Sequence, residues 1–252
     1  MILLLLAATA LHAAAVGKAA PVFVVELGPR IGNLYGQILH EENRFYAQGG
    51  LQVVGSDGTS SPPDLGVTAL GLDAGAYLQF RPDLRAGLGL VVQTLWTQPA
   101  QAPASNDRAT LLTEEAIVFR GSWQPWVFGP VRVGAEIGAG PSFATLHRFG
   151  LAARNLLTRV DTIPPPAATP QQMTNWTRLG HQSLDLLGLR TEFSLKATGD
   201  LSPRFGIDGR FGAHWTPWSV TGTDPLPRAG WNYPSSLSGW GIDFAVDLQG
   251  KF

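Results

Sequence analysis

The chain has 252 residues, which is enough for one barrel or sandwich or for two small domains. Its 18 basic and 19 acidic residues nearly balance, so the charge gives no indication of a nucleic-acid or acidic partner. The absence of cysteine excludes a disulfide scaffold, a thiolate zinc site and a cysteine nucleophile. Only 15% of the residues are charged, while 30 are glycine and 19 are proline, a composition unusual for a soluble enzyme.

The first segment, residues 1–11, is an apolar run that is too short to span a bilayer as a helix. Ala13 and Ala15 follow with the small-residue spacing that signal peptidase accepts. We therefore expect residues 1–15 to be a cleaved secretory signal peptide and residues 16–252 to form a single domain.

Eight later stretches alternate apolar and polar side chains with the period of two that is typical of β-strands. They span residues 22–36, 66–80, 85–98, 110–123, 131–146, 180–198, 204–218 and 237–252. Three connections are short and rich in turn-forming residues, namely 81–84, 124–130 and 199–203. Four are long and polar, namely 40–64, 99–109, 148–179 and 220–236. Strict alternation of long and short connections is typical of up-and-down membrane barrels.

The sixth and eighth stretches differ in regularity. In the sixth, residues 184–187 break the alternation, and a β-bulge there would restore it. The eighth alternates almost perfectly, with Phe244, Val246 and Leu248 on one face and Asp243 and Asp247 on the other. At about 3.3 Å per residue and a tilt near 40°, residues 240–252 span roughly 30 Å, which matches an apolar membrane band with its borders.

The period of two leaves open whether the apolar face points outward, as in a membrane barrel, or inward, as in a lipocalin-like carrier. Aromatic residues gather near strand ends, as expected at a membrane–water interface: Phe80, Trp96, Trp123, Trp126, Phe143, Trp215, Trp218, Trp240 and Phe252. Glycines gather on the polar face, where a narrow interior needs space beside long side chains: Gly28, Gly32, Gly71, Gly75, Gly87, Gly89, Gly134, Gly138, Gly140, Gly206 and Gly212. The polar face is also too sparsely charged for a water-facing surface. These features favour an outward apolar face.

This register assigns eight acids and eight bases to the barrel interior. The acids are Glu26, Asp73, Glu114, Glu136, Glu192, Asp208, Asp243 and Asp247. The bases are Arg30, Arg85, Arg120, Arg132, Arg190, Lys196, Arg210 and Lys251. Isolated charges in a narrow interior are costly, so we expect them to pair across strands. Because eight strands enclose little more than their own side chains, we expect a plugged lumen.

The strand count, the loop order and the terminal Phe252 resemble the small outer-membrane barrels of the OmpA, OmpX and OmpW type. The resemblance implies an all-β, eight-stranded antiparallel up-and-down transmembrane barrel in a Gram-negative outer membrane, with both termini periplasmic. It also implies contact with membrane lipid and recognition by the barrel-assembly machinery through the C-terminal strand. It carries over no functional residues, and we expect no cofactor.

Three functional hypotheses follow. The first is a non-enzymatic surface, structural or interaction protein that uses its long loops, above all 148–179. The second is a narrow conduit for a small or hydrophobic solute, as in OmpW-like proteins. The third is a lipid-modifying enzyme, because His181, Ser183 and Asp185 faintly resemble the His-x-Ser motif of the lipid A deacylases. In this sequence Leu184 follows the serine, and the serine rather than the imidazole lies in the middle, so we expect no catalytic triad. The dispersed histidines likewise predict no metal site.

Overall fold

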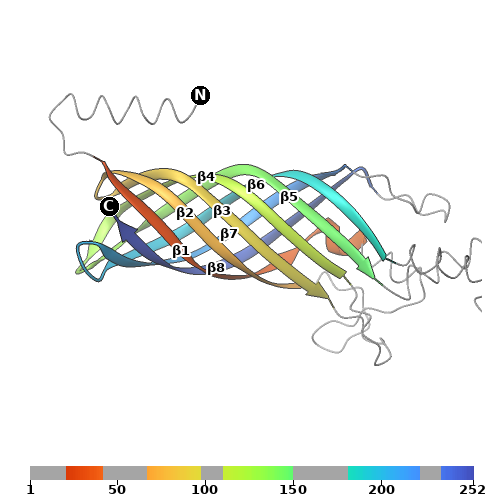
Figure 1. The fold of residues 1–252 in the computed structure, drawn as a ribbon, viewed down its shortest axis with the longest axis horizontal. Coiled ribbons are helices and arrows are strands. Elements are labelled where there is room, and N and C mark those ends of the chain that lie inside the picture. Colours follow the sequence, from red (N-terminus) through yellow and green to blue (C-terminus); the bar gives the residue numbers. More distant parts are fainter. Residues whose placement is uncertain (1–20, 42–66, 98–109, 150–180, 222–233) are drawn as a thin grey trace, which may run out of the picture.

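A computed structural model describes residues 21–41, 67–97, 110–149, 181–221 and 234–252. The expected signal peptide and most residues of the long connections lie outside these ranges. Eight antiparallel strands follow one another: β1 (Val22–Tyr35), β2 (Val67–Arg81), β3 (Leu84–Thr97), β4 (Thr110–Phe128), β5 (Val131–Phe149), β6 (His181–Asp200), β7 (Phe205–Val220) and β8 (Ser236–Lys251). Each pairs with its neighbours in the chain, and β8 pairs with β1 to close the barrel (Figure 1). The predicted eight-stranded barrel is therefore confirmed.

The short connections all lie at one end of the barrel, together with Pro21 and Phe252, and we call this the turn end (Figure 1). The opposite end, where β1, β3, β5 and β7 finish, is the loop end. One short connection differs from the prediction. Residues 124–128 continue β4 instead of forming a loop, with a register shift between Trp123 and Trp126. The turn is only Gly129 and Pro130, where Gly129 has a φ of 60° that favours glycine.

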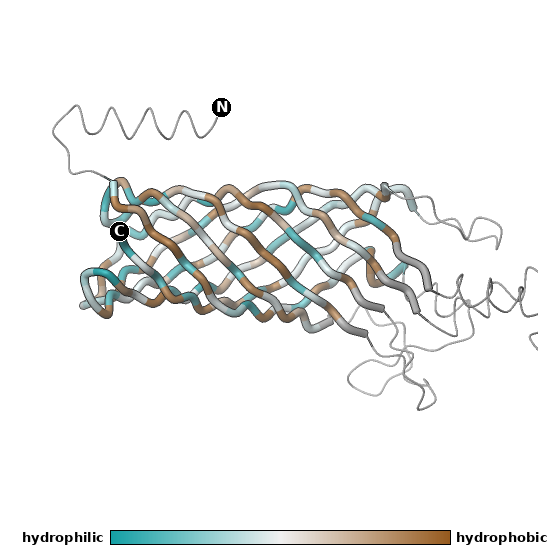
Figure 2. The backbone as a smooth tube through the Cα atoms, viewed as in Figure 1, coloured by the Kyte–Doolittle hydropathy of each residue, from teal (hydrophilic) through white to brown (hydrophobic). Residues whose placement is uncertain are grey.

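The two faces of each strand meet different surroundings, as the alternating hydropathy along the strands in Figure 2 illustrates. On β8, Phe244 and Leu248 point outward with 48% and 68% of their surface exposed, whereas Asp247 is completely buried inside. The outer surface therefore presents apolar side chains and the interior polar ones. This confirms the predicted orientation and is the pattern of a barrel surrounded by acyl chains.

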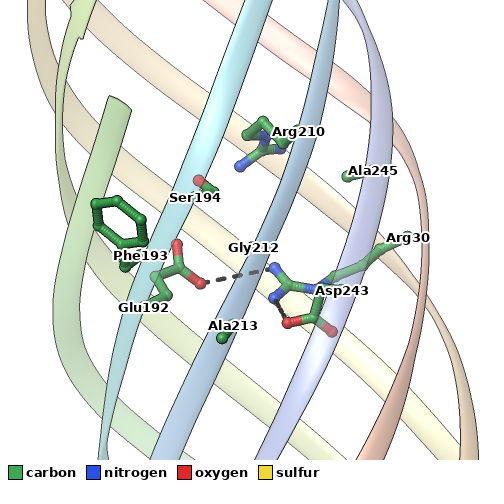
Figure 3. Close-up of a pocket in the computed structure, with 9 residues that line it drawn as sticks. All are labelled: Arg30, Glu192, Phe193, Ser194, Arg210, Gly212, Ala213, Asp243 and Ala245. Atoms are coloured by element: carbon green, nitrogen blue, oxygen red, sulfur yellow. Dashed lines mark hydrogen bonds and ion pairs between the residues drawn. The ribbon is translucent and has the colours of Figure 1, made fainter. Parts of the chain in front are cut away.

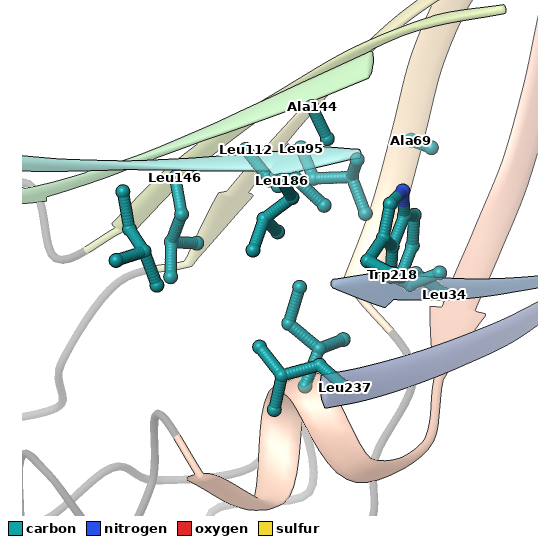
Figure 4. Packing of buried hydrophobic residues seen from close by; sticks show 11 residues of the cluster. Leu34, Ala69, Leu95, Leu112, Ala144, Leu146, Leu186, Trp218 and Leu237 are labelled. Carbon is teal, nitrogen blue, oxygen red and sulfur yellow. The ribbon is translucent and has the colours of Figure 1, made fainter. Parts of the chain in front are cut away.

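The loop end of the interior is apolar, which the sequence did not predict. A cluster of buried side chains fills it, and we call it the apolar cap (Figure 4): Leu34, Ile38, Ala69, Leu95, Leu112, Ala144, Leu146, Leu184, Leu186, Trp218 and Leu237. Ile38 enters the cap from a helical turn at residues 37–41, which follows Gly36 with its φ of 109°. Among the described residues, no helix is long and apolar enough to cross a bilayer.

Two predictions about this end are wrong. The pairing of β5 with β6 is continuous from Val131↔Gly199 to Phe149↔His181, so β6 contains no bulge at residues 184–187. Leu184 and Leu186 point inward and Asp185 outward, and the pattern was obscured because Leu187 on the outer face is apolar too. Trp218, assigned to the membrane interface, is 1% exposed and belongs to the cap.

Candidate functional site in the barrel interior

Between the apolar cap and the turn end, all eight strands contribute charged side chains to the interior. We call this set the polar network: Glu26, Arg30, Asp73, Arg85, Glu114, Arg120, Glu136, Arg190, Glu192, Lys196, Asp208, Arg210, Asp243 and Asp247. All are buried except Glu192, which is intermediate. Their side chains meet because inward positions recur at every second residue on each strand.

Asp73 on β2 is the centre of the network. Arg120 donates two hydrogen bonds to its carboxylate, at 2.6 and 2.8 Å. Arg210 lies 2.6 Å from the same carboxylate and Arg30 lies 3.1 Å from it. Three guanidinium groups thus converge on one buried acid. They are compensated further by other acids, since Arg120 also contacts Glu192 at 2.5 Å.

Glu26 is the corresponding centre nearer the turn end. Lys196 donates to both of its oxygens at 2.9 Å, and Arg85 donates to one of them at 2.6 Å. Lys196 also reaches Glu136 at 3.1 Å, and this carboxylate is 3.3 Å from Arg210. The turn-end part is therefore joined to the central part by a continuous chain of opposite charges.

Nearer the loop end, Asp243 and Glu114 share Arg190, whose nitrogens lie 3.4 and 2.9 Å from the two carboxylates. Asp243 also receives Arg30 at 2.5 Å and lies 2.5 Å from Nδ1 of His214. Figure 3 shows the guanidinium of Arg30, from β1, between the carboxylates of Glu192 on β6 and Asp243 on β8.

Uncharged polar residues also take part in the interior hydrogen bonding. The pattern of charged residues in the sequence could not identify them. Gln124 and Thr198 accept hydrogen bonds from Arg85 at 3.0 and 2.9 Å. Ser142 donates to Glu114 at 2.7 Å and accepts from Trp218 at 3.2 Å, so it joins the polar network to the apolar cap. Their inward register positions could have identified them as members of the network. An inward polar side chain in an eight-stranded barrel has only other side chains as hydrogen-bond partners.

Arg132 and Lys251 were assigned to the network, but the structure places them elsewhere. Both lie at the turn end, where Lys251 pairs with the exposed Asp200. Within the described part of the chain, Arg132 makes no ion pair. The network consequently contains eight carboxylates and six permanent cations, not the equal numbers that the sequence suggested. His214 contacts one of these carboxylates, that of Asp243.

The network leaves little free space. A cavity beside Arg30, Glu192, Arg210 and Asp243 has a volume of about 20 Å³ (Figure 3), which is room for about one water molecule. Close packing extends to the glycines. A Cβ on Gly89 would lie 2.6 Å from the guanidinium of Arg120, so an alanine there would force that group to move away from its carboxylate partners. Among the described residues, the side chains around this cavity are therefore closely packed, as expected for eight strands.

The described residues offer little for catalysis or metal binding. Asp185 is exposed and accepts a hydrogen bond from the Thr145 hydroxyl at 3.3 Å. The side chains of His181 and Ser183, the other members of the weak triad candidate, lie outside the described part of the chain. Among the described residues, no group of three or more potential ligands is arranged to hold a metal ion.

Neither a protein-family model nor a curated protein matches the sequence. Several solved structures resemble it. Neisserial surface protein A is 10% identical with a TM-score of 0.43, over 91% of this chain and 97% of that one. The outer membrane protein OprG from Pseudomonas aeruginosa is 9% identical with a TM-score of 0.44, over 92% and 96%. The outer membrane protease OmpT from Escherichia coli is 9% identical with a TM-score of 0.34, over 92% and 97%.

Proposed function

We propose that this protein is a closed, non-enzymatic barrel of a bacterial outer membrane that acts as a surface, structural or interaction protein. The apolar outer face supports the membrane location, because large side chains such as Ile137 and Phe211 would be poorly placed in water. The lipid of the bilayer is then the partner of this face. The turn end would be periplasmic, in keeping with the short periplasmic turns of such barrels.

The observation that carries the proposal of a closed barrel is the filling of the interior by two successive layers. An ion crossing the barrel would first have to separate the pairs of the polar network around Asp73 and Glu26. It would then have to enter the apolar cap, where Leu34, Leu95 and Leu186 offer no hydrogen-bonding group. Apolar constrictions exclude ions by dewetting, so the two layers act as barriers in series.

We propose that the long connections at the loop end make the contacts with extracellular partners. All four connections join strand ends that carry residues of the cap. Residues 150–180, between β5 and β6, form one of the two longest connections, and we propose this segment as the main contact with an extracellular partner. Deleting it while keeping the strands should abolish partner binding without preventing barrel formation.

We also propose that the C-terminal strand is the segment that the barrel-assembly machinery recognises. Phe252 is 80% exposed, and its backbone exchanges hydrogen bonds with Phe23 at 2.8 and 3.1 Å. We propose that its exposed side chain contacts the machinery, while its backbone completes the seam between β8 and β1. Phe252→Ala should slow assembly in cells yet leave the folded barrel formed in vitro nearly as stable.

Current measurements in planar bilayers test the closed barrel. The purified full chain should give no lasting conductance steps, while a 16-stranded porin reconstituted in parallel provides the open reference. Stable, repeated conductance would contradict the proposal and favour a narrow conduit. Altered lipid A in cells overexpressing the protein would instead favour a lipid-modifying enzyme.

A further inference from the structure

The turn end of the barrel opens into a cavity of about 350 Å³, which we call the vestibule. Arg81, Arg85, Arg132 and Lys251 line it, and Asp200 is the only acid among the described residues that line it. The remaining wall includes the apolar side chains of Val22, Phe80 and Pro203. A volume of this size lies in the range of small-molecule sites, which is roughly 300–1,000 Å³.

The four cations differ in how far their charge is already compensated. Arg85 is buried and held by Glu26 at 2.6 Å, and Arg81 pairs with Asp83 at 2.7 Å. Lys251 pairs with Asp200, which is largely exposed. Arg132 makes neither an ion pair nor a side-chain hydrogen bond with any other described residue, although it is half-buried in the wall. The vestibule therefore contains one guanidinium, that of Arg132, without a paired acid among the described residues. It also contains one lysine, Lys251, whose acidic partner is exposed and could give way to another anion.

A partly buried guanidinium without a partner favours an oxyanion, because its planar donors match two oxygens at once. We propose that the vestibule binds a phosphate group carried by an organic molecule, with Arg132 as the main contact and Lys251 as the second cation. The apolar part of the wall suits the organic portion. The same chemistry is offered by a phospholipid head group and by a soluble phosphate ester.

The test uses the full chain in maltoside micelles, which carry no phosphate, and follows the arginine side-chain Nε–Hε signals by NMR. One arm adds glycerol 3-phosphate, and the other adds phosphatidylglycerol to the micelles. We expect saturable shifts of the Arg132 signal in at least one arm. Saturation with glycerol 3-phosphate alone assigns the site to soluble esters, and saturation with phosphatidylglycerol alone assigns it to the lipid.

Three variants distinguish a built site from general attraction, with binding in the variants followed through the Arg85 signal. Arg132→Gln should weaken binding by about tenfold or more, since a hydrogen bond to a charged group is lost. Asp200→Asn should strengthen binding several-fold, because it removes a competing carboxylate and releases Lys251. Arg204→Gln is the control, because Arg204 is exposed at the same end but does not line the vestibule.

Three results would overturn the proposal. The first is the absence of saturable shifts in both arms. The second is binding that Arg132→Gln leaves unchanged. The third is a loss in Arg204→Gln as large as in Arg132→Gln, which would mean that general positive charge at the turn end attracts phosphate. Because Arg132 holds no structural partner among the described residues, its replacement leaves the barrel able to fold.

Discussion

The polar network and the apolar cap fill the same barrel interior in opposite ways. The network depends on directional partners, as around Asp73, where three arginines converge. The cap depends on shape and volume, as around Trp218, which packs among leucines and alanines. The inward face of a barrel strand therefore need not be polar along its whole length. The difference also predicts that the two layers respond differently to substitution.

Asp73→Asn should have the largest effect, because it removes the negative charge on which Arg30, Arg120 and Arg210 converge. Breaking a buried ion pair by removing one partner costs about 3–5 kcal/mol. We expect a loss of that size in the free energy of unfolding, measured by urea titration of the barrel in lipid vesicles.

The matched control for Asp73 is Asp83→Asn, which breaks the exposed ion pair with Arg81 at the turn end. Exposed pairs contribute little, because water screens both charges. An unfolding midpoint close to the unmodified protein is expected. Similar losses in the two variants would mean that the interior is hydrated and that the network is not a buried one.

Leu186→Ala tests the cap against its outward neighbour Leu187→Ala. Leu186 is 2% exposed and Leu187 43% exposed, although both lie on β6. Both variants lose apolar transfer energy, but only the first leaves a cavity in the interior, so it should lose about 1–2 kcal/mol more. Equal losses from the same urea titration would show that the cap is loosely packed.

Gly89→Ala tests how tightly the network is packed. The added Cβ would lie 2.6 Å from the Arg120 guanidinium and displace it from Asp73 and Glu192. Overpacking of this kind costs about 2 kcal/mol. Gly209→Ala is the control, since its Cβ would meet nothing within 4 Å. A Gly89→Ala barrel as stable as the control would mean that Arg120 is free to move.

Ser142→Ala should have the smallest effect, and it tests the junction between the two regions. The hydroxyl of Ser142 donates to Glu114 and accepts from Trp218. Glu114 keeps Arg190, so the main loss is the buried indole donor, which should cost about 1 kcal/mol. A shift in tryptophan fluorescence should accompany it, and an unchanged spectrum would argue against the Trp218–Ser142 bond.

The number of strands, their order and their orientation could be predicted from the sequence, because one polar and one apolar face per strand repeat along most of the chain. Leu186 and Trp218 were not placed correctly, since near the loop end the inward positions are apolar and outward neighbours such as Asp185 and Ser219 are polar. Polarity therefore does not mark the inward face there. Residues 124–128 were read as a loop, because Pro125 and a register shift hide a strand there.

The candidate site could be predicted only in outline. Inward position follows from register, so most of the charged residues in the interior could be named from the sequence. Which acid meets which base depends on the stagger between strands, which no local pattern encodes. For the same reason the sequence does not show how far each inward residue lies from the turn end. Arg132 and Lys251 were therefore grouped with charges that lie deeper in the barrel.

The orientation of β8 in a bilayer decides whether the apolar face of the barrel meets lipid. Because the chain has no cysteine, single cysteines can be introduced at each position from 240 to 248 and spin-labelled. We expect oxygen accessibility to alternate, with maxima at 242, 244, 246 and 248 and minima at the inward positions between them. Maxima at 243, 245 and 247, or an even profile along the strand, would contradict an apolar outer face around a filled polar interior.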